Sequence, residues 1–137
     1  MKYWFAAVVA VVLMAAGAEA RAAQTPLGVT LQVTVDGITP AGGNLIIGVY
    51  DEATFALAPD VPLFTQTVAN AHGSAVVVFN RLPPGTYALK AVQDVNRDGR
   101  AGPGEPLAVS NGASPANFDA AAITLQPGEN AAVLHLR

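Results

Sequence analysis

The chain has 137 residues, enough for one domain, and carries a formal net charge of −3 with no cysteine. The absence of cysteine excludes disulfides, thiol nucleophiles, thiolate metal sites and N-terminal lipid attachment of the bacterial lipoprotein type. The mildly acidic charge balance argues against nucleic acid as a partner. Because only 12% of the residues are charged and Ala, Val, Gly and Pro are frequent, the composition favours a small, turn-rich β protein over a disordered chain.

The N-terminal segment has the pattern of a secretory signal peptide. Lys2 supplies a positive charge, residues 3–17 form an uncharged and mostly apolar run, and small residues then allow cleavage after Ala20 or Ala22. The alternative is an uncleaved membrane anchor, but the apolar run is shorter than the ~20 residues that a spanning helix needs. We therefore predict a signal peptide over residues 1–22 and a folded domain over residues 27–137. Such a protein is periplasmic or secreted and is not membrane-bound after cleavage.

The remainder of the chain has the pattern of short strands separated by turns. Residues 27–35 alternate strictly between apolar and polar or small side chains, which predicts a strand with one buried face. No stretch after residue 22 has a sustained helical period, so we predict a single antiparallel β-sandwich of about seven strands. The other predicted strands are 45–50, 63–68, 75–79, 86–93, 118–125 and 131–136. Residues 107–109 are a candidate for a further short strand, and residues 52–56 for one helical turn.

Residues 94–105 read D-V-N-R-D-G-R-A-G-P-G-E and match the spacing of a calcium-binding loop. Ca²⁺ takes six to eight oxygen ligands, so a loop must supply oxygen atoms at alternate residues and then turn sharply. The predicted ligands are the side chains of Asp94, Asn96, Asp98 and Glu105 and the backbone carbonyl of Arg100, with a water bridging from Gly102. A predicted strand, not a helix, precedes Asp94, and Pro106 disfavours helical geometry at Glu105. The loop is therefore not an EF-hand, although calcium remains its expected cofactor.

The same residues have a second interpretation that needs no metal. Asn and Asp side chains form Asx-turns and Gly adopts positive φ, so D-x-N-x-D-G is also typical of a polar turn. If successive strands are antiparallel, the loop lies at the same end of the sandwich as the turns at 36–44 and 70–73. A further ligand is then expected from Asp36, Asn70 or His72, and not from Asp51, which is expected at the opposite end.

The sequence gives little support for an enzyme. Neither His72 nor His135 accompanies a G-x-S-x-G nucleophile elbow around Ser74 or Ser110. The adjacent acids Asp51 and Glu52 are expected in a solvated loop and to point apart, which does not suit glycoside hydrolysis. Tyr87 follows Gly85 by two residues, which predicts a tyrosine corner with its hydroxyl bonded to backbone near the turn.

Two motifs carry a resemblance to a known family. They are L-P-P-G-T-Y-A at 82–88 and D-x-N-x-D-G at 94–99, with weaker support from the dipeptide Ser110-Asn111 and the segment that opens at Phe118. Together they resemble family 2141 of the secreted bacterial domains of unknown function. The resemblance implies an exported immunoglobulin-like or prealbumin-like β-sandwich with no established activity.

These observations leave two functional hypotheses. The first is a non-enzymatic module at the cell envelope, stabilised by one calcium ion, that binds an unidentified protein or glycan or has a structural role. The alternative is a prealbumin-like protein that binds a small ligand or a carbohydrate.

Overall fold

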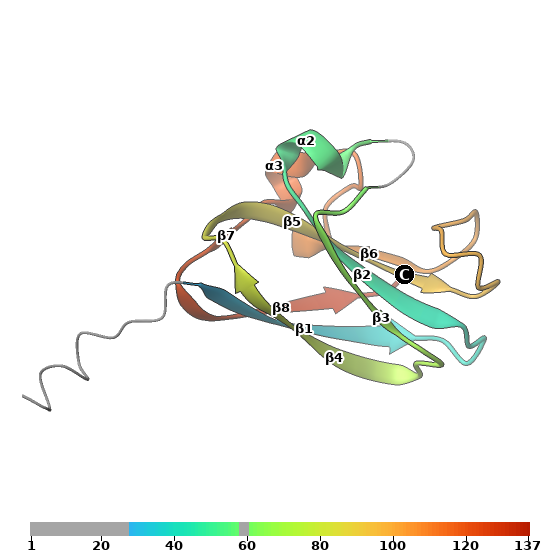
Figure 1. Ribbon diagram of the computed structural model, residues 1–137. Helices are drawn as coiled ribbons and strands as arrows, with labels where there is room; N and C mark the ends of the chain where they lie inside the picture. Colours follow the sequence, from blue (N-terminus) through green and yellow to red (C-terminus); the bar gives the residue numbers. More distant parts are fainter. Residues whose placement is uncertain (1–27, 58–60) are drawn as a thin grey trace, which may run out of the picture.

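The computed structural model describes residues 28–57 and 61–137, which form two packed β-sheets (Figure 1). The predicted signal peptide lies outside these residues. The smaller sheet has the order β4-β1-β8, and the larger has the order β3-β2-β5-β6 with β7 also paired to β5. The strands are β1 (Val29–Ile38), β2 (Asn44–Tyr50), β3 (Phe64–Val68), β4 (Gly73–Leu82), β5 (Gly85–Asp94), β6 (Leu107–Val109), β7 (Ile123–Leu125) and β8 (Gly128–His135). The predicted all-β sandwich is confirmed.

One strand pair departs from the antiparallel prediction. β8 pairs with β1 in parallel, in an unbroken register from Val29 opposite Gly128 to Asp36 opposite His135. A pair of parallel strands needs a long connection between them. Here residues 39–127, which include all the other strands, form that connection. Just after β8, the amide of Arg137 donates to the carbonyl of Leu107 and its carbonyl accepts from the amide of Leu107, so the last residue joins the larger sheet at β6.

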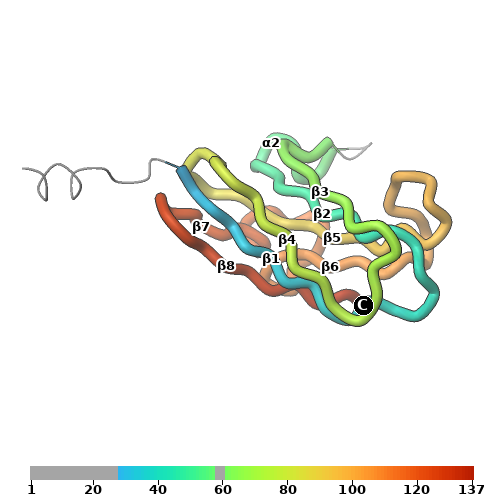
Figure 2. Tube along the Cα trace, turned by 60° about the horizontal axis from the view of Figure 1, so that its bottom comes forward, coloured from blue at the N-terminus to red at the C-terminus, as the bar shows by residue number. Residues whose placement is uncertain are grey.

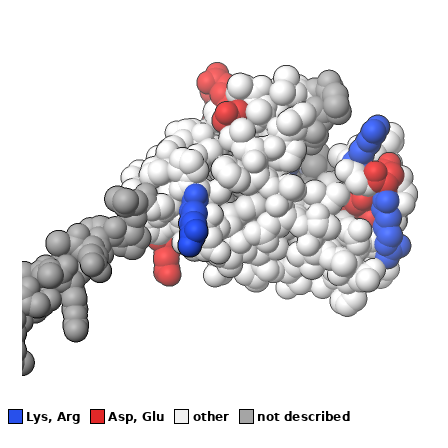
Figure 3. Space-filling view, viewed as in Figure 1, with Lys and Arg blue, Asp and Glu red and all other residues white. Residues whose placement is uncertain are grey.

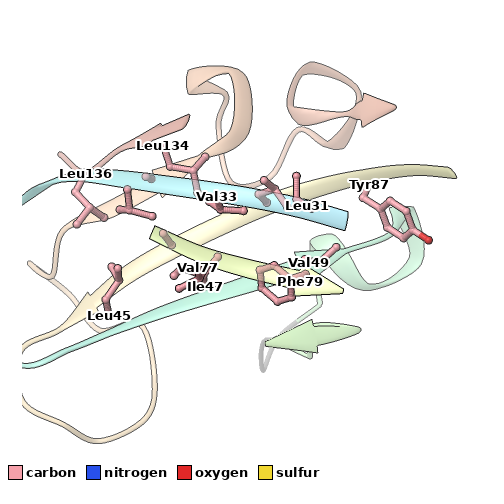
Figure 4. Close-up of a cluster of buried hydrophobic side chains, with 14 of the residues drawn as sticks. Leu31, Val33, Leu45, Ile47, Val49, Val77, Phe79, Tyr87, Leu134 and Leu136 are labelled. Carbon is pink, nitrogen blue, oxygen red and sulfur yellow. The ribbon is translucent and has the colours of Figure 1, made fainter. Parts of the chain in front are cut away.

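The main core fills the space between the two sheets (Figure 4). Alternate residues of β1, namely Val29, Leu31, Val33 and Val35, are fully buried, as the strict alternation in the sequence predicted. Leu45, Ile47 and Val49 of β2 face them from the larger sheet. Tyr87 closes one end of this core, and its hydroxyl donates to the carbonyl of Pro83 at 2.7 Å, so the predicted tyrosine corner is confirmed.

A second, smaller core covers part of the outer face of the larger sheet. It contains Tyr50, Phe55, Ala88, Val109 and Ala121. Two short helices, α2 (Glu52–Phe55) and α3 (Phe118–Ala121), lie over this face (Figure 1), together with the 3₁₀ turn η1 (Ser110–Gly112). β5 is buried on both of its faces between Tyr87 and Asp94, and Ala88 on its outer face belongs to this second core. Among the described residues no helix is long and apolar enough to cross a membrane.

The predicted strand over residues 118–125 is wrong in its first half. Asn117 caps α3 by accepting a hydrogen bond from the amide of Ala120 at 3.1 Å, and only Ile123–Leu125 form a strand. The predicted strand at 107–109 and the predicted helical turn near 52–56 are present as β6 and α2. α2 begins at a capping box in which the carboxylate of Asp51 accepts from the amide of Thr54 and the hydroxyl of Thr54 accepts from the amide of Asp51.

Candidate metal site

The loop that follows β5 is placed by the alternation of that strand. Lys90, Val92 and Asp94 lie on the outer face of the larger sheet, because Leu89 and Ala91 between them belong to the main core. Asp94 is the last residue of β5, pairs with Asn44 of β2, and is only 1% exposed. The strand thus presents a buried carboxylate at the point where the loop begins.

Three acidic side chains converge in this loop. One carboxylate oxygen each of Asp94, Asp98 and Glu105 lies within 4.8 Å of the others. Asp94 is buried, Glu105 is half-buried and Asp98 is exposed, so the group opens to solvent on one side. Of the predicted metal ligands, these three are brought together directly. Asn96 lies beside them, because its side-chain amide donates to Asp98 at 3.3 Å.

Backbone amides of the loop hold the first two carboxylates. The two oxygens of Asp94 accept hydrogen bonds from the amides of Asp98 at 3.2 Å and Gly99 at 2.8 Å. Asp98 accepts from the amide of Arg100 at 2.9 Å. The bond from Arg100 to Asp98 and that from the amide of Asp98 to Oδ1 of Asn96 at 3.2 Å span two residues, as in the Asx-turns that the sequence also predicted. The bonds to Asp94 span four and five residues and fold the loop around the acidic group. A carboxylate oxygen has two lone pairs, so one such bond still leaves it able to bind a cation.

Glu105 closes the loop from its other end. Its Oε2 accepts from the amide of Val95 at 2.6 Å, and its Oε1 accepts from the amide of Gly102 at 2.7 Å. The glutamate therefore reaches back across the loop to the residue after Asp94. No exiting helix is needed for this contact, and none follows, because β6 begins at Leu107.

The electrostatics of the loop favour the ionised form of Asp98. The hydrogen bond from the Arg100 amide lowers the pKa of Asp98, with smaller contributions in the same direction from Asp94, Asn96 and the Arg100 charge and an opposing one from desolvation. In Figure 3, acidic and basic side chains gather at the end of the molecule that carries this loop, and much of the face shown is uncharged. The loop is thus the most highly charged part of this view.

The prediction about which turns share an end of the sandwich is confirmed. The side chain of Gln93 accepts from the amide of Thr39 at 2.9 Å and donates to the carbonyl of Gly42 at 2.8 Å, which ties β5 to the β1–β2 turn. In Figure 2 that turn and the loop after β5 lie at the same end of the molecule. Asn70 accepts from the guanidinium of Arg97 at 2.8 Å. Asp51 follows the opposite end of β2 from Asn44.

The remaining candidates have other contacts. Asp36 is hydrogen-bonded to His135 on the neighbouring strand β8, and His72 is exposed. Ser110 is buried; its hydroxyl donates to the carbonyl of Ala121 and accepts from the amide of Leu89, so its hydrogen bonds fasten η1 and α3 to β5. These contacts are structural and match no catalytic arrangement of serine with histidine.

A comparison with models of protein families shows which family the chain belongs to. The model of the bacterial family described as "Uncharacterized protein conserved in bacteria (DUF2141)" matches residues 33–133. The chain belongs to this family. The DUF2141 match spans both sheets and the whole of the acidic loop, and the description of the family assigns no enzymatic activity. No curated protein and no solved structure matches the chain.

Lys90 lies on the same face of β5 as Asp94, and the sequence did not single it out in this DUF2141 protein. It is 8% exposed, and its ammonium donates to the carbonyl of Phe55 at 2.5 Å and lies 4.7 Å from the ring centroid of Tyr50. The only signal in the sequence was that a lysine occurs inside an otherwise apolar strand.

Proposed function

We propose that this DUF2141 protein is an exported, non-enzymatic β-sandwich module whose loop between β5 and β6 binds one calcium ion. In this proposal the calcium-stabilised end of the sandwich has a binding or structural role at the cell envelope. Export is proposed from the signal-peptide pattern of residues 1–22.

The observation that supports calcium most is the burial of Asp94 within a group of three carboxylates. The amides of Asp98 and Gly99 compensate Asp94 in part, but Asp98 and Glu105 bring two further carboxylates within 4.8 Å, and a cation would relieve the repulsion among the three. Carboxylate oxygens are hard ligands, which suits Ca²⁺ and not the softer transition metals. The side chain of Asn96 and the backbone carbonyl of Arg100 would complete the set.

The affinity expected for such a site is low. Extracellular calcium modules bind with dissociation constants of about 10⁻⁴ to 10⁻³ M, which suits compartments where calcium is abundant. At a free calcium concentration of 100 times the dissociation constant, binding should stabilise the folded state by about 2.7 kcal/mol. Thermal unfolding of the purified protein in calcium and then in EGTA measures this shift.

A matched pair of variants assigns the shift to the loop. Asp98→Asn removes one negative charge from an exposed position without changing the shape of the side chain, and should weaken calcium binding in calorimetric titrations by about tenfold or more. Asp119→Asn makes the same change on the exposed surface of α3 and should leave the titration unchanged. An equal melting temperature in millimolar calcium and in EGTA would remove the metal from this account.

A further inference from the structure

A groove of about 690 Å³ crosses the outer face of the larger sheet, next to the acidic loop. Its volume lies in the range of small-molecule sites in proteins. One wall is made by the loop itself, at Gly99, Arg100 and Ala101. Another is made by Leu57 and Pro62, which lie in the connection between α2 and β3. In Figure 3 the surface is hollowed between these two parts of the molecule.

The floor of the groove is mostly apolar. It consists of alternate, outward-facing residues of four neighbouring strands: Ile46 and Gly48 of β2, Thr65 of β3, Val92 of β5 and Leu107 of β6. Gly48 is required there, because a Cβ atom would lie 2.9 Å from the ring of Tyr50 and 3.0 Å from Pro62. The floor therefore suits the apolar body of a ligand.

Exposed apolar side chains also occur close in sequence to the groove residues Leu57, Pro62 and Thr65. Leu57, Val61, Leu63 and Phe64 are between 37% and 51% exposed, and they form the largest sequence-local group of exposed large apolar residues in the part of the chain that the structure describes. Leu57 also lines the groove, so this apolar segment adjoins the groove at that residue.

The charges along the groove are positive. Lys90 and Arg100 line it, and no Asp or Glu does so among the described residues. The ammonium of Lys90 is engaged by the carbonyl of Phe55 and by the faces of two aromatic rings, so Lys90 is part of a packed wall. Arg100 is exposed on the rim, where its guanidinium is able to pair with an anionic group on a bound ligand.

We propose that this groove binds a small amphipathic anion, with its apolar body on the sheet and its single acidic group paired with Arg100. A smaller hollow of about 360 Å³ near η1 is less suitable, because it shares no residue with the acidic loop and the side-chain amide of Asn111 on its edge already donates to the carbonyls of Ala120 and Ala122.

Calcium in the neighbouring loop should strengthen this binding, a consequence that rests on the proposed function. The amide of Arg100 donates to the carboxylate of Asp98 at 2.9 Å, which keeps this carboxylate beside the residue that carries the exposed cation of the groove. A calcium ion bound to Asp98 would neutralise that carboxylate, leaving Arg100 freer to attract an anion. By linkage the anion would strengthen calcium binding by the same factor.

A matched pair of fluorescent probes tests the groove. The probes are 1-anilinonaphthalene-8-sulfonate and N-phenyl-1-naphthylamine, which share an apolar body and differ by the sulfonate. In EGTA and low salt, we expect the purified protein to bind the sulfonate more tightly. Arg100→Gln should weaken binding of the sulfonate about threefold to fivefold, as for an exposed ion pair, and leave the neutral probe unchanged. Arg97→Gln, with the same charge change in the same loop, should alter neither.

A blocking variant locates the probe. Thr65 is exposed on the groove floor, so Thr65→Trp should fill the groove and abolish binding of both probes, whereas Val76→Trp on the exposed face of the smaller sheet should not. Unchanged binding by Thr65→Trp, or equal effects of Arg100→Gln and Arg97→Gln, would overturn the groove proposal.

A final titration of both probes in the presence of calcium tests the coupling. Calcium should raise the affinity of the protein for the sulfonate probe alone. Failure of calcium to bind would refute the proposed function and the coupling, while the measurements in EGTA still decide the groove.

Discussion

At the scale of single residues, the acidic loop depends on a close backbone contact made by Gly43. This glycine has φ of +93° and lies in the turn that joins β1 to β2. A Cβ atom on it would lie 2.2 Å from the carbonyl oxygen of Asp94 and 2.7 Å from Cα of Val95. Gly43 therefore allows β2 to approach the residue at which the acidic loop begins.

Gly43→Ala is expected to destabilise the fold by at least about 2 kcal/mol, because it combines a strained positive φ with a collision against backbone. Gly42→Ala is the matched control. Its φ is +79° but no heavy atom lies within 4 Å of the added Cβ, so only the strain of about 1 kcal/mol applies. Urea unfolding of the two variants measures the difference. Equal losses would show that the contact with Asp94 has no energetic consequence.

The acidic residues of the loop could be predicted from the sequence, but their surroundings could not. The alternate spacing of Asp94, Asn96 and Asp98 and the later Glu105 identified the group that the structure brings together. The near-complete burial of Asp94 depends on which parts of the chain cover its strand. The spacing of acidic residues in the sequence does not predict that cover. The hydrogen bond from Val95 to Glu105 likewise depends on the path of the whole loop.

At the scale of elements, α2 is stable only because of what it packs against. A helix of four residues has no independent stability in water, so the fold must hold it in place. Phe55 is fully buried and contacts the rings of Tyr50 and Phe118 edge to face, at centroid distances of 6.2 and 5.7 Å. The ammonium of Lys90 lies over the same ring at 4.5 Å. Phe55 thus connects α2 and α3 with the outer face of β5.

Phe55→Ala should therefore cost about 3 kcal/mol or more of stability, because it leaves a cavity at the centre of this second core. It should also increase amide hydrogen exchange in α2 and α3. Phe64→Ala removes the same side chain from a position that is 37% exposed and should cost less than about 1 kcal/mol. A loss from Phe55→Ala no greater than that from Phe64→Ala would contradict the role assigned to the second core.

The second core also explains the error made for residues 118–125. Phe118 and Ala121 both contact this core and are three residues apart, which is the spacing of one helix face. A single helical turn is too short for that period to stand out, so the apolar run resembled a strand. The same core covers Ala88 on the outer side of β5.

At the scale of the whole molecule, the sandwich is completed by its last strand. β8 pairs only with β1 among the strands of the smaller sheet, and the residues that pair are about a hundred positions apart, as with Asp36 and His135. Contacts of such large sequence separation form slowly, because the loop they close is nearly the whole chain. The strands that shape the groove and the acidic loop are therefore stabilised by the pairing of β8 with β1, which no local pattern in the sequence predicted.

A pair of neighbouring substitutions in β8 tests this closure. Leu134 is 1% exposed in the main core, whereas Val133 is 55% exposed on the outer face. Leu134→Asp places an unpaired charge between the sheets and should cost more than about 4 kcal/mol, a large part of the stability of a small domain. Val133→Asp changes only an exposed strand position and should cost about 1 kcal/mol. Amide-proton dispersion and urea unfolding measure both. If Leu134→Asp stays folded with native dispersion in β1 and β4, β8 is not required to close the sandwich.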